Sequence, residues 1–220
     1  MSNNFAYHPS KVLLPVMGSQ HSSQHSYNYQ PLLSGDKFPA IVLNRSSFIS
    51  VRDQDLFGQS FTSLQDILDY PQPLVLAFLS VTNKVVDVNA WKSLQADIEI
   101  MGGRLLIVTN GDSRHFTHKI RKENQLNIWE DRHGQLSEDV GLFDLQNPIS
   151  DWLSGIDTDI PLPAFYVVGQ DQTILFHHID YALRTVDGKD FSNSSFVRNL
   201  LTSVYQASSE KNNQLRRAIS

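Results

Sequence analysis

The stretch PLVLAFLS, from Pro73 to Ser80, is a nearly continuous apolar run of strand length. A strand inside a parallel sheet is covered on both faces, so it reads as an apolar run rather than as an alternation of apolar and polar residues. We therefore expect a central strand here. The loop VTNKVV follows it, and the next stretch, Asp87 to Met101, is amphipathic. Its apolar residues at helical spacing are Trp91, Leu94, Ile98 and Met101.

Outward from this pair, RLLIVTN at Arg104 to Asn110 predicts a second buried strand. The glycines before it, Gly102 and Gly103, are typical of helix ends. Beyond it, SRHFTHKIRKEN has a serine cap and helical spacing, and a short strand is predicted at Leu126 to Trp129. The runs AFYVVG and TILFHHID, separated by the turn QDQ, predict two paired strands. This alternation indicates an α/β domain with a largely parallel sheet.

The two ends of the domain are also predicted. PAIVLN and SFISV, Pro39 to Asn44 and Ser47 to Val51, predict an opening hairpin or a pair of short strands, and TSLQDILDY predicts a helix capped by Thr62 or Ser63. A last helix is expected over 190–205. Its apolar residues, expected to pack on the sheet, are Val197, Leu200, Leu201 and Val204.

Composition divides the chain into three parts. Residues 1–34 are rich in Ser, Gln, Asn, His and Tyr without helical or strand periodicity, so we expect a mobile polar arm. Residues 35–206 are expected to form a single domain, because a chain of 220 residues can bury one substantial hydrophobic core. Residues 207–220 are polar and are expected to fray.

The absence of cysteine from the whole chain excludes more chemistry than any motif supplies. It removes disulfides, iron-sulfur clusters, thiolate-zinc sites and every cysteine nucleophile. A net charge of -5 gives no electrostatic reason to bind nucleic acid, and the basic run HKIRK reads as a solvated helix face. No stretch approaches the roughly 20 apolar residues of a membrane helix, so we expect no membrane contact and a cytoplasmic location.

The eight histidines raise the question of a metal site. His115 and His118 have the i, i+3 spacing that places two ligands on one helix face, but no third ligand lies nearby. His177 and His178 are adjacent in a predicted strand and should point to opposite faces. The motifs G-x-G-x-x-G, G-x-S-x-G, H-E-x-x-H and the Walker loop are all missing. We expect neither a metal nor a cofactor.

Several strings, in this order, resemble the peroxiredoxin-like branch of the alkyl hydroperoxide reductase and thiol-specific antioxidant family, over roughly residues 35–205. SGDKFPAIVL is similar to the family's entry segment, LVLAFLS to the strand before the redox loop, and IMGGRLLIVTNGD to the following helix end and strand. PLPAFYVVGQDQTILFHHID is similar to the late strand pair. The resemblance implies an α/β, thioredoxin-like fold of the redoxin type, with a central mixed sheet flanked by helices.

The same resemblance places the lost chemistry. An ungapped match puts Lys84 and Asp87 at the two positions of a Cys-x-x-Cys, with Asp87 in place of the peroxidatic cysteine and Lys84 in place of a helper threonine. The arginine of the peroxidases would fall near Leu162. Pro163 corresponds to a proline that this fold holds in cis, although trans is the usual state of any X-Pro bond. The pocket it implies is lined by Ser80, Thr82, Asn83, Trp91, Pro163 and Arg184.

Simpler roles exist for both vestigial positions. Asp87 is a good helix N-cap, and a carboxylate at a helix N-terminus meets the same electrostatic demand as a thiolate there. Lys84 reads as a solvated cation whose ion pair with Asp87 would contribute little.

Three hypotheses for function remain open at this point. The first is a non-catalytic redoxin-fold protein that binds a protein partner, a small ligand or a second copy of itself near the former redox pocket. The second is a non-thiol enzyme on the same scaffold that uses Asp87 with Lys84 or a histidine. The third is a different fold, such as a flavodoxin-like sheet, which would need a phosphate loop after Ser80.

Overall fold

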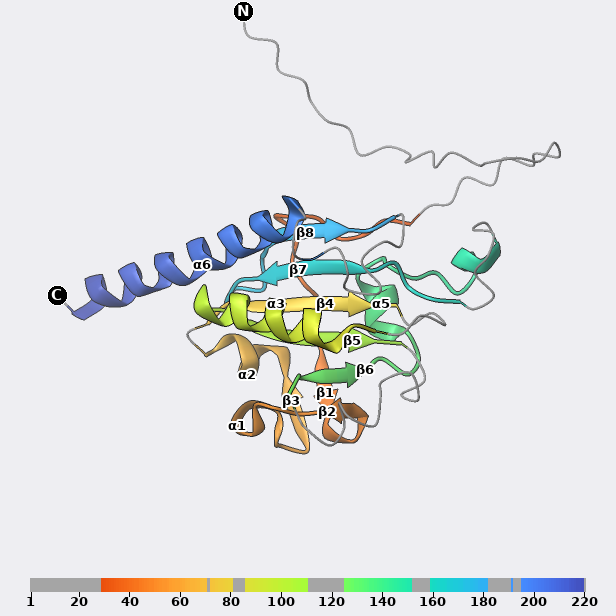
Figure 1. Ribbon diagram of the computed structural model, residues 1–220, viewed down its shortest axis with the longest axis horizontal. Coiled ribbons are helices and arrows are strands. Elements are labelled where there is room, and N and C mark those ends of the chain that lie inside the picture. Colours follow the sequence, from red (N-terminus) through yellow and green to blue (C-terminus); the bar gives the residue numbers. More distant parts are fainter. Residues whose placement is uncertain are drawn as a thin grey trace, which may run out of the picture.

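The computed structural model describes residues 29–70, 72–80, 86–110, 125–151, 159–181, 191 and 195–219, with the side chains of the last helix described up to residue 209. The strands form one six-stranded sheet and a separate two-stranded sheet (Figure 1). The strands are β1 (Val42–Asn44), β2 (Phe48–Ser50), β3 (Phe61–Ser63), β4 (Leu74–Leu79), β5 (Arg104–Thr109), β6 (Ile128–Glu130), β7 (Ala164–Val168) and β8 (Ile174–Ile179). The helices are α1 (Gln54–Phe57), α2 (Leu64–Leu68), α3 (Val88–Ile100), α5 (Gln135–Asp139) and α6 (Ser195–Ile219), with short 3-10 turns at Arg45–Ser47 and Ile149–Asp151.

The main sheet is mixed, with six strands in the order β2-β6-β5-β4-β7-β8. Only β4 with β5 and β5 with β6 pair in parallel, and the remaining neighbours are antiparallel. The central mixed sheet that the resemblance implied is therefore confirmed. The largely parallel sheet expected from the alternation of elements is wrong, because β7 and β8 form a hairpin that joins β4 in the opposite direction.

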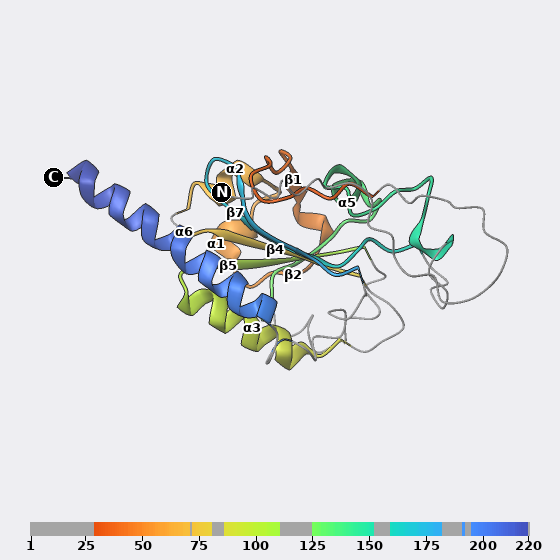
Figure 2. The ribbon, with the colours of Figure 1, turned by 90° about the horizontal axis from the view of Figure 1, so that it is seen from above.

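Each face of the sheet is covered by its own apolar cluster. Alternate residues of β4 point to opposite sides, so Val75 and Ala77 meet α3 and α6, whereas Leu76 and Phe78 meet the layer that contains α2 and α5. Figure 2 shows α3 and α6 together on one side of the strands and α2 and α5 on the other. Every residue of β4 is buried, which confirms the central strand predicted from PLVLAFLS.

Helix α3 begins and ends close to the predicted residues. Asp87 is its N-cap, and the chain leaves it through Gly102, whose φ of 84° is a left-handed conformation that glycine adopts without strain. The amide of Gly102 donates to Glu99 O at 2.9 Å, and the amide of Gly103 donates to Ile98 O at 2.9 Å. The predicted cap of α2 is Ser63, which forms a capping box with Asp66.

Of the two alternatives predicted for the start of the domain, the pair of short strands is confirmed and the hairpin is wrong. β1 pairs with β3, and β2 pairs with β6, so the two neighbouring strands do not pair with each other. The turn Arg45–Ser47 between them carries the chain from the small β1-β3 ribbon to the edge of the main sheet. β3 is only three residues long, Phe61–Ser63, and too short to be recognised by alternation.

The last helix, expected over 190–205, ends later than predicted. Helix α6 starts at Ser195, packs Val197, Leu200 and Val204 into the core as predicted, and continues without a break to Ile219 (Figures 1 and 2). No glycine or proline stands in this stretch, and its Ala, Glu, Lys, Gln, Leu and Arg residues all have good helix propensity. Polarity alone therefore does not mark the end of a helix.

The last residues assigned to the arm pack on the domain. Tyr29 and Leu32 contact the apolar cluster that contains α5, and the amide of Leu32 donates to Val140 O at 3.1 Å. We call residues 29–38 the strap. It continues along β8, where Gly35 and Asp36 exchange backbone hydrogen bonds with Ile174 at 2.8 and 2.9 Å. The ordered domain thus begins before residue 35.

Several predictions fall outside the described residues, namely those on the arm before residue 29, on the basic run HKIRK and on the pair His115 and His118. Across the part of the chain that is described, no helix combines the length and the apolar character needed to cross a bilayer.

Candidate functional site

The sheet topology brings the expected site residues to one edge. β4 and β5 are parallel and joined through α3, so the helix runs back along the sheet and begins where β4 ends (Figure 1). β7 is antiparallel to β4 and begins at the same edge. Ser80, Asp87 and Pro163 all flank this end of the sheet. In open α/β sheets, the carboxyl ends of the strands are where ligands bind.

Ser80 ties two parts of this edge together. It follows β4, is fully buried, and its Oγ donates a hydrogen bond to the carbonyl oxygen of Pro161. A buried hydroxyl that lost this acceptor would cost free energy, so the bond holds the end of β4 against the entry of β7. The carbonyl of Pro163 in turn accepts from the amide of Asp180 at 2.8 Å.

The Leu162–Pro163 peptide bond is trans, because the described residues contain no cis peptide. The cis state implied by the resemblance is therefore wrong for this chain. Leu162 is completely buried in the apolar cluster, and its amide donates to Leu142 O at 2.8 Å. The position that the resemblance assigns to an arginine thus belongs to the core and offers no charge to a ligand.

Asp87 caps α3, which confirms the simpler of its two predicted roles. One carboxylate oxygen, Oδ1, accepts hydrogen bonds from the amides of Asn89 at 3.0 Å and Ala90 at 3.2 Å. The side chain is otherwise exposed to solvent. A carboxylate that accepts hydrogen bonds from two backbone amides at a helix N-terminus serves to cap that helix.

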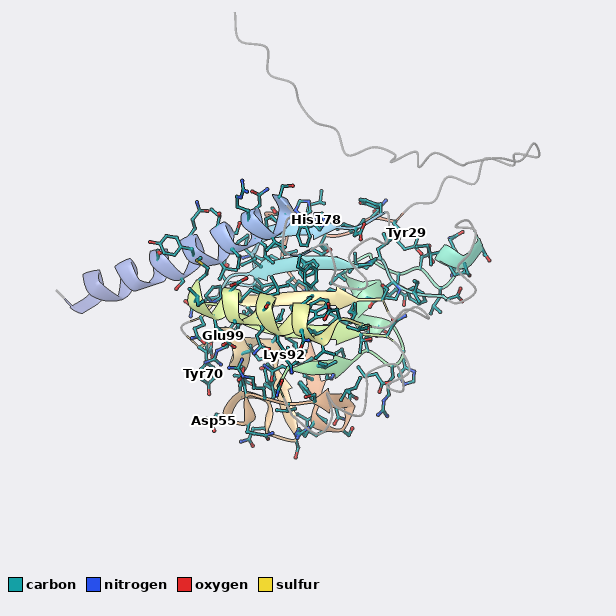
Figure 3. The ribbon with its side chains drawn as sticks, viewed as in Figure 1. Tyr29, Asp55, Tyr70, Lys92, Glu99 and His178 are labelled. Carbon is teal, nitrogen blue, oxygen red and sulfur yellow. The ribbon has the colours of Figure 1, made fainter. Side chains whose placement is uncertain are left out.

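Trp91 is part of the core and has almost no surface to offer a ligand. Only 2% of it is exposed, and its indole stacks on Phe165 with a centroid distance of 5.9 Å and meets Phe191 edge-on at 4.9 Å. Phe196 adds to this aromatic cluster and stacks flat on His178 at 4.3 Å. Figure 3 shows His178 at the side of β8 that faces α6.

His177 lies on the other face of β8, where its Nδ1 accepts a hydrogen bond from the amide of Ser34 at 2.9 Å. The prediction that the two adjacent histidines point to opposite faces is confirmed. The remaining expected site residues, Lys84, Thr82, Asn83 and Arg184, lie outside the described residues.

Sequence reasoning missed a polar group at the same edge. Asn110 directly follows β5, and its Nδ2 approaches the carbonyl oxygen of Asp159 at 3.5 Å, while its Oδ1 is buried and has no hydrogen-bond partner among the described residues. The hydroxyl of Ser150 donates to the carboxylate of Asp159. The available signal was the placement of a polar residue at the end of a buried strand, which is where such edges carry function.

A surface hollow lies beside the strap, among Tyr29, Glu138, Asp139 and Asp144. Of the residues predicted for the pocket, the described ones, Ser80, Trp91 and Pro163, do not line it. Burial and the carboxylate of Asp144 raise the pKa of Tyr29 to about 12. Within the described ranges, no three His, Asp or Glu side chains are grouped as a metal site would require.

No protein-family model and no curated sequence matches the chain. Solved structures do match it. Peroxidoxin BcpB from Mycobacterium tuberculosis superimposes with a TM-score of 0.53 at 11% identity, over 79% of this chain and 96% of that one. The chain has the peroxiredoxin fold. AhpC from the same organism gives a TM-score of 0.50 at 17% identity, over 79% and 98% of the two chains. The thiol peroxidase from Chromobacterium violaceum gives 0.50 at 11% identity, over 79% and 88%.

The chain has the peroxiredoxin fold but contains no cysteine. Thiol chemistry needs a thiolate as nucleophile, and only a cysteine side chain could supply it. The peroxiredoxin fold and the absence of cysteine are the two facts on which an assignment of function depends.

Proposed function

We propose that this chain is a peroxiredoxin-fold protein without peroxidase or disulfide reductase activity, whose role is to bind at the sheet edge flanked by Ser80, Asp87 and Asn110. The absence of cysteine supports the negative half of this proposal, namely that the chain has neither peroxidase nor disulfide reductase activity. The positive half, that the chain binds at this edge, is supported by the Oδ1 of Asn110. This buried acceptor has no hydrogen-bond partner among the described residues and lies at an edge where α/β sheets bind ligands.

A non-thiol enzyme that uses Asp87 is less well supported. General acid-base catalysis requires a carboxyl group held near its substrate and free to exchange a proton. The carboxylate of Asp87 is exposed and bonded to the amides of Asn89 and Ala90. We therefore assign Asp87 to stabilising the start of α3.

The negative half is tested on the purified full-length chain with hydrogen peroxide consumption and insulin reduction, each with thiol reductant supplied. We expect no turnover above buffer in either assay. Turnover that persists after metal chelation would contradict the proposal.

An engineered thiol tests whether Asp87 occupies the former nucleophile position. Asp87→Cys and the control Asp97→Cys place single thiols at exposed positions near opposite ends of α3. The N-terminal thiol should have the lower pKa, since the unpaired backbone amides and helix dipole stabilise its anion. Alkylation rates measured against pH report both values. Equal pKa values would show that the head of α3 has lost the electrostatic character of a thiolate site.

The binding half is tested by recording backbone amide resonances of the native chain at increasing protein concentration, because a second copy is one of the proposed occupants. Shifts confined to Ser80, Asp87 and Asn110, with Asp97 unchanged, would support self-association at this edge. If none of these amides moves at millimolar concentration, a second copy is excluded as the occupant. A screen of small polar ligands against the same resonances then addresses the remaining candidate.

A further inference from the structure

The strap, residues 29–38, is fastened to the sheet by a hydrogen bond that depends on one histidine. The amide of Ser34 donates to Nδ1 of His177 at 2.9 Å, and the Oγ of Ser34 lies 2.9 Å from the same nitrogen. An amide N–H can only donate, so Nδ1 must hold a free lone pair. The imidazole is therefore neutral when the strap is docked, with its proton on Nε2.

The other described attachments of the strap include backbone hydrogen bonds and one exposed ion pair. Gly35 and Asp36 bond to the backbone of Ile174, and Leu32 bonds to the carbonyl of Val140. Lys37 pairs with Asp171 at 2.8 Å, and both side chains are largely exposed. Protonation between about pH 5 and 7 can therefore act on this strap through His177, since an imidazole is the side chain that ordinarily changes charge in that range.

We propose that protonation of His177 loosens the strap from the edge of β8. An imidazolium carries a hydrogen on each ring nitrogen, so Nδ1–H would point at the Ser34 amide hydrogen in place of accepting from it. The hydroxyl of Ser34 can reverse its role and accept from Nδ1–H, but the amide cannot. The amide of Ser34 therefore loses its partner on protonation.

The charged and titratable groups around His177 influence its pKa. Asp36 of the strap is the nearby carboxylate, and its Oδ2 accepts a hydrogen bond from the amide of Leu33. Tyr166 of β7 lies opposite His177 in the sheet, and its hydroxyl is buried. Tyr181, just after β8, contributes to raising the pKa of Tyr166. His178 and Asp180 interact on the opposite face.

Burial lowers the pKa of His177 more than Asp36 raises it, so the net shift is downward from 6.5. The folded protein thus resists protonation more than the unfolded chain does. Above about pH 6.5 both states are neutral and the docked strap keeps its full stability. As the pH falls through the lowered folded value, this contribution is lost.

Hydrogen exchange of single amides in the full chain tests the proposal. Between about pH 7.5 and about pH 5, the exchange of the Ser34, Leu32 and Gly35 amides should accelerate by about tenfold after correction for intrinsic rates. Amides of β4 should keep their protection. Uniform protection of the strap at both pH values would overturn the proposal.

Two neighbouring substitutions separate the switch from a general effect of acid. In His177→Asn, the amide oxygen can accept from Ser34 in place of Nδ1 without titrating, so strap exchange should become independent of pH. In His178→Asn, the acid response of the strap should persist, since that ring packs on Phe196. If His178→Asn abolishes the response, or His177→Asn retains it, the switch is not His177.

Should His177→Asn fail to fold, a proton titration of the native chain decides the matter. The Nδ1 and Nε2 chemical shifts of His177 should change in parallel with the exchange rate of Ser34. A midpoint for His177 that differs from the midpoint of strap loosening would refute the link.

Discussion

The hydroxyl of Ser80, at the end of β4, donates a hydrogen bond to the carbonyl of Pro161, 81 positions later in the chain. This bond joins the end of β4 to the segment that enters β7. Both residues are buried, so neither group has water as an alternative partner. It is the described contact that most directly holds the two halves of the candidate site edge together.

Ser80→Ala should lower the free energy of unfolding by about 1–3 kcal/mol, because it leaves the buried carbonyl of Pro161 without this donor. Urea unfolding monitored by circular dichroism measures the change. Ser46→Ala is the control, since Ser46 is exposed and its hydroxyl donates to its near neighbour Asn44, and the variant should stay within about 0.5 kcal/mol of the native chain. Equal effects of the two substitutions would show that the Ser80 bond is not maintained in solution.

Asp87→Ala should destabilise the protein by about 1 kcal/mol, because the amides of Asn89 and Ala90 lose their acceptor. Asp87→Ser should retain most of the stability, since serine is also a good N-cap. Asp97→Ala, on the exposed face of the same helix, controls for loss of negative charge. The capping assignment would be untenable if Asp97→Ala cost as much as Asp87→Ala.

Gly141→Ala should displace the strap. Gly141 has φ of 72°, and a Cβ atom there would lie 2.1 Å from the carbonyl oxygen of Gln30. We expect a loss of more than about 2 kcal/mol, combining backbone strain with the clash. Gly35→Ala separates the two causes, because Gly35 has φ of 99° but open space where its Cβ would be. Only Gly141→Ala should accelerate exchange of the Leu32 amide.

Gln172→Gly should stabilise the β7-β8 turn by about 1 kcal/mol. Gln172 is the one non-glycine residue with a positive φ, 64°, among those described, and glycine adopts this conformation without a steric penalty. Gln172→Ala removes the same side-chain bond to Gln65 but keeps the strain, so it should be neutral or destabilising. Thermal unfolding compares the two variants, and equal melting temperatures would show that the turn is not strained.

The elements of this chain that could be predicted are those specified by residues near one another. The apolar run at Pro73–Ser80 predicted β4, and Asp87 predicted the start of α3, because burial on both faces and N-capping leave local patterns. The opposite orientation of His177 and His178 followed from strand geometry alone. The absence of cysteine could be read from the sequence without any structure.

Pairing partners and contact distances depended on the tertiary structure. Long-range packing determined four features that no local pattern predicted. These are the separation of β1 from β2, the trans bond before Pro163, the core position of Trp91 and the bond between Ser34 and His177. Ser34 and His177 stand 143 positions apart, and no local pattern relates them. Periodicity and caps act within a few residues, whereas the folded sheet decides which distant side chains meet.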